Sequence, residues 1–380
     1  MAREVAVFRR RPLLFFCMAA APLLCMSFFT TLMSDGLPTD LPTGLVDEDN
    51  TKISRTMART LNAMQEVDIT HAYRSVTEAR EAMQRGEIYS FFYIPRGTTV
   101  EAVASWQPRV SFYTNDAYFV PGSMTMKDLK TASELTGLAL TREVLRKRGA
   151  TEDAVMDVLR PIEVDTHPLG NPTLNYAVYL NNMLLPGILI LLTMLSAAYA
   201  IGMEWKLGTQ REWYRLAGCS QTLALAGKLL PQTVLFTLMF WVMDVWFYGI
   251  EGYPCRCGAG AMLLLGFVTV LAAQAFAVFF MGVNIGQLRL SMCLCSLWGI
   301  LSFSLAGFTY PVTAMAPGLR TLAWLFPLRH YYIIYVNRAL NGYPLHYVLP
   351  HVLALATFLL LPLLVIRPYR RAILTGRYRA

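Results

Sequence analysis

Charged side chains are scarce in this sequence. They make up 15% of its 380 residues, against roughly 25% in an ordinary soluble domain. Hydrophobic residues make up 55%, and the mean hydropathy is +0.41. This composition offers too few polar groups to cover a water-soluble globule of this length. A single soluble domain is therefore excluded, and part of the surface must face lipid.

Motifs for catalysis, ATP binding and metal binding are also missing. The one Gly-Lys pair, Gly227-Lys228, has Thr222 where a phosphate-binding loop needs its first glycine, and Leu229 where it needs Ser or Thr. The sequence has no His-Glu-x-x-His and no Gly-x-Ser-x-Gly motif. The five histidines and seven cysteines lack the spacing of a zinc site or a disulfide framework. We expect no catalytic residue, no bound metal and no ATP hydrolysis in this chain.

Long runs with little or no charge are present instead. The first, residues 12–34, follows a cluster of arginines and is long enough to cross about 30 Å of hydrocarbon. Ala19-Ala20-Ala21 resembles a signal-peptide cleavage site, but the apolar character resumes at Leu23, which favours an uncleaved anchor. Five further runs lie at about 179–203, 222–249, 259–283, 291–309 and 348–366. The sequence thus predicts an α-helical polytopic membrane protein with six transmembrane helices.

Residues 35–175 have the composition of a water-facing domain. Residues 35–165 hold 20 acidic and 15 basic side chains. Helical spacing from Ile53 to Met64 and a Ser75-to-Glu78 capping box predict helices. Strands are predicted at 67–73, 88–94 and 109–114, and a long helix at 124–148. We expect an inserted mixed α/β domain here.

The distribution of charge predicts the orientation. With a cytoplasmic N-terminus, the short inner segments hold fourteen Lys and Arg residues against four in the short outer loops. Both termini are then cytoplasmic, residues 35–175 are extracytoplasmic, and 367–380 form a basic tail. The net charge of +8 is the sum of 15 − 20 = −5 in residues 35–165 and 18 − 5 = +13 elsewhere. The basic excess therefore reports orientation and gives no support to a nucleic-acid partner.

A charged segment at 204–216 separates the second and third runs. Its Thr209-Gln-Arg-Glu212 sequence follows Gly208 and matches a capping box, so we expect a helix to begin at Thr209 on the cytoplasmic surface. The segment is either an interfacial connector or a coupling helix. A coupling helix inserts into a partner protein and transmits its movement to the spans.

Two other groups are candidates for a gate or pathway. Pro311, Pro317 and Pro327 interrupt the apolar stretch 310–345, so it should not form one regular helix. Charged residues within spans are functional candidates. Lys228 and Asp244 lie 16 residues apart in the third run, or about 24 Å along a helix. Each would then lie about 3 Å from an interface of a 30 Å core, and snorkelling explains both. Asn284 is a packing or pathway group.

Several short motifs occur in a consistent order. They are Asn171-Pro-Thr-Leu-Asn175, Leu185-Pro186-Gly187, Glu204-x-x-x-Gly208-Thr209-x-x-Glu212, Gly227-Lys228, Gly307-Phe-Thr-Tyr-Pro311-Val-x-x-Met315-x-Pro317, and Pro327-Leu-Arg-His-Tyr-Tyr332 with Arg338. In the inserted domain, Val46-Asp47, Gly86-Glu-Ile and Tyr93-Ile94-Pro95 add to them. In these motifs and their order, the chain resembles the permease subunit of type 2 ATP-binding-cassette (ABC) exporters with a large extracytoplasmic insert.

The resemblance implies a half-transporter in the bacterial inner membrane. It would pair with a second permease, identical or paralogous, and with separate ATPase subunits that bind ATP and Mg, so this chain itself carries no cofactor. It implies an ATPase-coupling element, a re-entrant outer loop at 310–345, and an outer domain that gates exit or docks a periplasmic adaptor. The coupling residues would be Glu204, Lys206, Gly208, Thr209, Arg211 and Glu212. Lys206 departs from the family pattern, which often has an acidic residue there.

A second hypothesis is a non-transporting membrane receptor or surface protein, similar to phage-infection proteins. Such a chain shares the anchor, the outer domain and the five-span layout. A neighbouring ATPase gene would favour the exporter.

Overall fold

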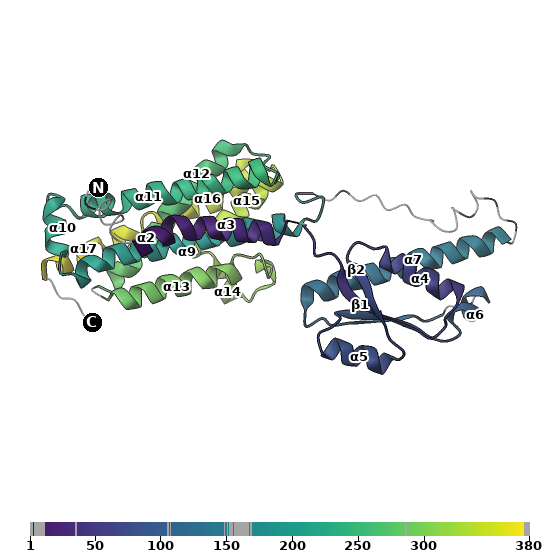
Figure 1. Cartoon of the computed structure of the whole chain (residues 1–380). Helices are drawn as coiled ribbons and strands as arrows, with labels where there is room; N and C mark the ends of the chain where they lie inside the picture. The colour runs from purple at the N-terminus through teal and green to yellow at the C-terminus, as the bar shows by residue number, and fades with distance from the viewer. Residues whose placement is uncertain are drawn as a thin grey trace. The chain divides into compact units, whose positions relative to one another are not determined.

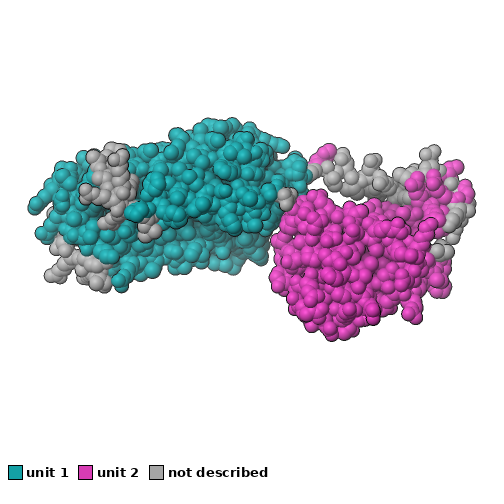
Figure 2. Space-filling model, viewed as in Figure 1, with its two compact units in different colours: residues 1–36, 168–380 teal, residues 37–167 magenta. Residues whose placement is uncertain are grey.

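The computed structural model describes residues 3, 12–34, 36–104, 106, 108–147, 149, 151, 155, 167, 169–285 and 287–375. The chain divides into two compact units (Figure 2). One unit comprises residues 37–167 and is called the insert below. The other comprises residues 1–36 and 168–380 and is called the membrane unit.

The insert contains a four-stranded sheet in the order β2-β1-β3-β4. Strands β1, β2 and β3 are parallel, and β4 is antiparallel to β3. Helices α4 and α7 cover one face and α5 covers the other (Figure 1). The strands are β1 Leu41–Asp47, β2 Val67–Ala72, β3 Ser90–Ile94 and β4 Ser111–Thr114. The helices are α4 Lys52–Asn62, α5 Val76–Gln84, α6 Thr98–Val103 and α7 Phe119–Lys147.

Two small cores hold the insert together. Met57 and Leu61 of α4 and Leu129 of α7 pack on Phe92 and Ile94 of β3. On the opposite face of the sheet, alanines of α5 pack against strand residues whose positions alternate with those of Phe92 and Ile94. This is the period of two that a strand imposes on its side chains.

A hydrogen-bonded aspartate joins the carboxyl ends of β1 and β3. Asp49 accepts hydrogen bonds from the backbone amides of Gly97 at 2.9 Å and Thr99 at 3.1 Å. The Thr51 and Thr99 hydroxyls also donate to it. Partial burial raises the pKa of the Asp49 carboxyl, but the hydrogen bonds from Thr99, Thr51 and Gly97 outweigh it and hold the pKa below its usual value.

The membrane unit consists of helices. The chain is helical from Pro12 to Leu32, through α2 Pro12–Phe15, a π-helical turn Phe16–Ala20 and α3 Ala21–Leu32. It continues with α9 Tyr176–Lys206, α10 Gln210–Leu216, α11 Gln221–Val245 with a π-helical turn Trp246–Ile250, α12 Ala259–Val283 and α13 Leu288–Leu305. Helices α16 Leu349–Phe358 and α17 Leu361–Thr375 follow the outer loop.

Within the described residues, five helical segments are long and apolar enough to cross a membrane. They are Tyr176–Lys206, Gln221–Ile250, Ala259–Val283, Leu288–Leu305 and Leu345–Ile373. The apolar helix Phe16–Leu32 is shorter. The helical membrane fold with a small mixed sheet is thus confirmed, while the sixth span and the position of the insert outside the cytoplasm stay predictions.

Glycines allow the spans to approach closely. At Gly202 of α9, an added Cβ would overlap Leu288 of α13, and at Gly299 of α13 it would overlap Leu191 of α9. Small residues at such contacts let helices pack by van der Waals contact where lipid gives no hydrophobic driving force. Helix α9 therefore lies at the centre of the unit, in contact with α11, α12 and α13.

Asn171 and Asn175 organise the return of the chain into the membrane unit. The Asn171 side chain bonds the backbone of Asn175, and the Asn175 side chain caps α9 by accepting from Ala177 N at 2.8 Å. The amide of Tyr176 then donates to the carbonyl of Gly36 at 2.6 Å. The end of the first apolar helix and the beginning of α9 are thus joined directly.

The stretch 310–345 is broken into short elements, as its prolines predict. Pro317 and Pro327 each stand at the first residue of a helix, where the missing amide is not needed. The elements are a 3₁₀ turn Val312–Ala314, α14 Pro317–Ala323, α15 Pro327–Tyr335, a π-helical turn Val336–Leu340 and a 3₁₀ turn Leu345–Val348.

Candidate functional site

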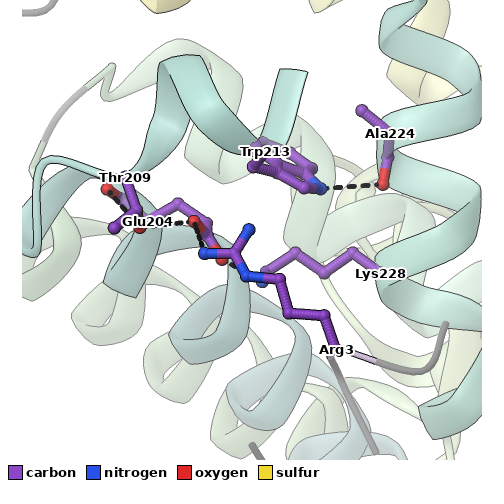
Figure 3. A network of polar contacts seen from close by, with 6 residues as sticks. All are labelled: Arg3, Glu204, Thr209, Trp213, Ala224 and Lys228. Carbon is purple, nitrogen blue, oxygen red and sulfur yellow. Dashed lines mark hydrogen bonds and ion pairs between the residues drawn. The ribbon is translucent and has the colours of Figure 1, made fainter. Parts of the chain in front are cut away.

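A buried carboxylate stands at the junction of three helices. Glu204 lies in the last turn of α9 and is 6% exposed. Its Oε1 atom is 2.6 Å from Nζ of Lys228 on α11. Its Oε2 atom accepts from the Thr209 hydroxyl at 2.6 Å and from an Arg3 guanidinium nitrogen at 3.2 Å. Figure 3 shows Arg3, Thr209 and Lys228 converging on this carboxylate.

The Thr209 contact corrects the predicted capping box. Helix α10 begins at Gln210 with Thr209 as its N-cap residue, but the Thr209 side chain makes no capping hydrogen bond. Its hydroxyl donates to Glu204 instead. A charged acceptor makes a stronger hydrogen bond than a neutral one. The hydroxyl thus ties the start of α10 to the end of α9.

Helix α10 is also tied to α11. The indole of Trp213 donates to the carbonyl of Ala224 at 3.1 Å (Figure 3). The Lys228 ammonium lies 5.5 Å from the centre of the Trp213 ring, within the range of a cation–π interaction. Trp205 of α9 meets Trp213 edge to face at 6.4 Å. The short helix is therefore held by aromatic and charged contacts to both neighbouring spans.

Lys228 does not snorkel as its position in the sequence suggests. Its side chain is 3% exposed and ends on Glu204 rather than in solvent. The reason is geometric, because an opposite charge on α9 lies within hydrogen-bond distance. Buried charges are tolerated when they are paired and hydrogen-bonded, and removing one partner alone is strongly destabilising.

An open pocket of about 140 Å³ lies against this network. Arg3 and Lys228 contribute positive charge to its wall, and Trp213 contributes an aromatic face. Its remaining lining residues are Leu216, Ala217, Leu223, Ala224 and Gly227. The pocket is therefore amphipathic, with its charged groups also engaged on Glu204.

The other predicted coupling residues lie outside the buried network. Lys206, Gly208, Arg211 and Glu212 are all exposed. Gly208 has a φ of +71°, which glycine adopts without strain, and it ends the turn between α9 and α10. The structure thus brings Glu204, Thr209 and Lys228 together, while the charged residues Arg211 and Glu212 of α10 are exposed.

The gate and pathway candidates are dispersed. Pro311 and Pro317 are exposed, Pro327 is buried at the start of α15, and Asn284 caps the end of α12 by donating to the Phe280 carbonyl at 3.1 Å. Asp244 lies 16 residues beyond Lys228 on α11 and is 4% exposed.

Sequence reasoning missed Arg3 and Trp213 as members of the network. No local spacing links them to Glu204, since Arg3 lies 201 residues away along the chain.

Among the described residues, no cluster of three or more His, Cys, Asp or Glu side chains could hold a metal ion. The expected absence of a metal stays a prediction.

Comparison with protein families identifies the chain. A family model described as ABC-2 family transporter protein matches residues 12–366, which is nearly the whole sequence. Comparison with curated proteins finds no match. The chain belongs to the ABC-2 transporter family.

Proposed function

We propose that this ABC-2 family chain is the permease subunit of an exporter that moves a substrate outward across the bacterial inner membrane. Family membership supports the permease role. The excess of basic residues in the short inner segments supports cytoplasmic termini and an extracytoplasmic insert. The segment Phe16–Leu32 would then be the first of six spans.

The observation that carries the proposal is the attachment of α10 to two spans at once. Its N-cap residue, Thr209, donates a hydrogen bond to Glu204 of α9, and Trp213 donates one to the backbone of α11. The Glu204–Lys228 pair joins the same two spans to each other. A force applied to the exposed face of α10 would therefore move α9 and α11 together. This is the mechanical requirement of a coupling helix.

The partners follow from this role. Separate ATPase subunits would bind ATP and Mg and contact the exposed Lys206, Arg211 and Glu212. A second permease, identical or paralogous, would complete the pathway at the shared interface. The insert would gate exit or dock a periplasmic adaptor, and Pro311, Pro317 and Pro327 would shape the outer loop that closes the pathway.

Purification from native membranes tests the proposal. The full chain, isolated without harsh detergent, should carry an ATPase with it. A stable complex that lacks an ATPase would overturn the exporter assignment and favour the receptor hypothesis.

A second experiment tests coupling without knowledge of the substrate. In the complex, a non-hydrolysable ATP analogue should change the hydrogen exchange of α9 and α11. Thr209→Pro should abolish that change while the ATPase stays bound, because it removes both the hydroxyl bond to the Glu204 carboxylate and the hydrogen bond from the Thr209 amide to the Glu204 carbonyl. Thr209→Ser keeps the hydroxyl and is the matched control. An unchanged nucleotide response in Thr209→Pro would refute the coupling role of α10.

A further inference from the structure

The far end of α11 holds a carboxyl group that the coupling role does not use. Asp244 is 4% exposed, so its side chain does not reach solvent as snorkelling would require. Within the described residues, its Oδ2 atom has no hydrogen-bond partner. The contrast with Glu204 is direct, because Glu204 is buried to a similar extent but accepts from an ammonium, a guanidinium and a hydroxyl.

Three tyrosines lie within electrostatic range of this carboxyl group. Tyr248 lies in the π-helical turn that follows α11 and interacts electrostatically with Asp244 and with two tyrosines of α15, Tyr331 and Tyr335. Tyr331 and Tyr335 are 2% and 1% exposed, and their rings stack at 6.2 Å. Phe240, one turn before Asp244, packs against Tyr331 at 5.9 Å. Two titratable groups of the loop after α11 also face the site: Cys255 faces Tyr248 and Tyr335, and Tyr253 faces Tyr335.

The surroundings favour a neutral carboxyl group over a charged one. An ionised carboxylate that is buried without a cation loses its hydration and gains no opposite charge in return. A neutral carboxylic acid avoids that cost and is able to donate a hydrogen bond. In this conformation, within the described residues, neither the Asp244 Oδ2 atom nor the hydroxyls of Tyr248 and Tyr335 have a hydrogen-bond partner. Ionisable side chains within membrane segments are rare and are functional candidates by default, with proton binding among their roles.

We propose that Asp244 and the tyrosines Tyr248, Tyr331 and Tyr335 form a proton-binding site between α11 and α15, and that one proton occupies it in this conformation. The proton is the cation that fits, because it needs no cavity beyond the carboxyl group itself. Release of the proton requires water or another donor to reach Asp244, and therefore separation of α11 from α15. The site makes the separation of α11 from α15 sensitive to pH. Such pH sensitivity is a property beyond the proposed export function.

Infrared spectroscopy of the full chain in lipid nanodiscs tests the proposal. At neutral pH the wild-type spectrum should contain the C=O band of a protonated carboxylic acid, and Asp244→Asn should remove the intensity of one carboxyl group per chain. Asp40→Asn, which changes an exposed aspartate of the insert, is the matched control and should leave the band intact. An identical band in wild type and Asp244→Asn would overturn the proposal.

Further variants keep the test decisive. If Asp244→Asn does not assemble, Asp244→Glu should keep the band and shift its frequency, and an unshifted band would count against Asp244. Tyr248→Phe should shift the band without removing it, and no shift in any of the three Tyr→Phe variants would overturn the assignment of the tyrosines. If Asp244 in the wild type is ionised, and its carboxylate band responds to Na⁺ or tetramethylammonium, then another cation occupies the site. That result would overturn the proposal.

Discussion

Changing Lys228 to methionine removes one partner of the buried ion pair and nearly preserves side-chain volume. Glu204 then stays 6% exposed in its native position without its closest cation. Breaking a buried pair from one side costs about 3–5 kcal/mol. Thr209 and Arg3 still donate to Glu204 after the change. We therefore expect a loss in the free energy of unfolding near the lower limit, about 3 kcal/mol.

The double variant separates charge burial from packing. Glu204→Gln with Lys228→Met removes both charges, so no uncompensated ion remains. Replacing a whole buried pair is often neutral, and the lost hydrogen bonds cost about 1 kcal/mol each. The double variant should therefore be more stable than Lys228→Met alone, even though it carries one more substitution.

Reversible unfolding in mixed micelles with increasing sodium dodecyl sulfate measures these free energies. Lys206→Met is the matched control, because Lys206 is exposed in the last turn of the same helix that holds Glu204. It should change stability by less than about 0.5 kcal/mol. A Lys228→Met variant as stable as Lys206→Met would show that water reaches the pair, and would refute the reasoning.

Three further predictions follow from other contacts. Thr209→Val should cost about 2 kcal/mol in the same titration, because a hydrogen bond to a charged acceptor is lost, and a cost below that of Thr209→Ser would contradict the contact. Hydrogen bonds hold the pKa of Asp49 below its usual value, so this residue stabilises the insert above about pH 4 and the contribution is lost as pH falls through the lowered pKa. Asp49→Asn should therefore reduce the acid sensitivity of β1 and β3 amides in hydrogen exchange, and an unchanged acid response would contradict it. Gly202→Ala should destabilise the chain by about 1–3 kcal/mol through overlap with α13, whereas Gly260→Ala, where an added Cβ meets nothing within 4 Å, should not; equal melting temperatures for the two variants would contradict the close approach.

Local signals located most elements of the insert but missed its central strand. Residue spacing predicted α4 and β2, and other local patterns predicted α5, β3, β4 and the long helix α7. The sequence did not predict strand β1, because Pro42 and Gly44 are residue types that rarely occur inside a strand. Pro42 lies at the end that pairs only with β2. At Gly44 an added Cβ would lie 2.9 Å from Ile88 and Tyr73, so the tertiary contact explains the glycine.

The candidate site was predictable in part. The charged segment between two spans pointed to Glu204 and Thr209, and the capping pattern placed the start of α10 correctly to within one residue. The bond that Thr209 makes was not predictable, because Glu204 precedes it by five residues and offers a stronger acceptor than the local amides. The partner of Lys228 depends on how α9 packs against α11, and sequence spacing carries no information about that packing.

The hydrogen bond from Tyr176 to Gly36 has a consequence for how such chains diversify. It joins the two segments of the membrane unit that flank the insert. An insertion whose anchor points already touch can be lengthened, exchanged or deleted without rebuilding its host. The membrane unit therefore does not depend on the insert to hold its two flanking segments together. A short Gly-Ser linker in place of residues 37–167 should leave a helical unit that still assembles.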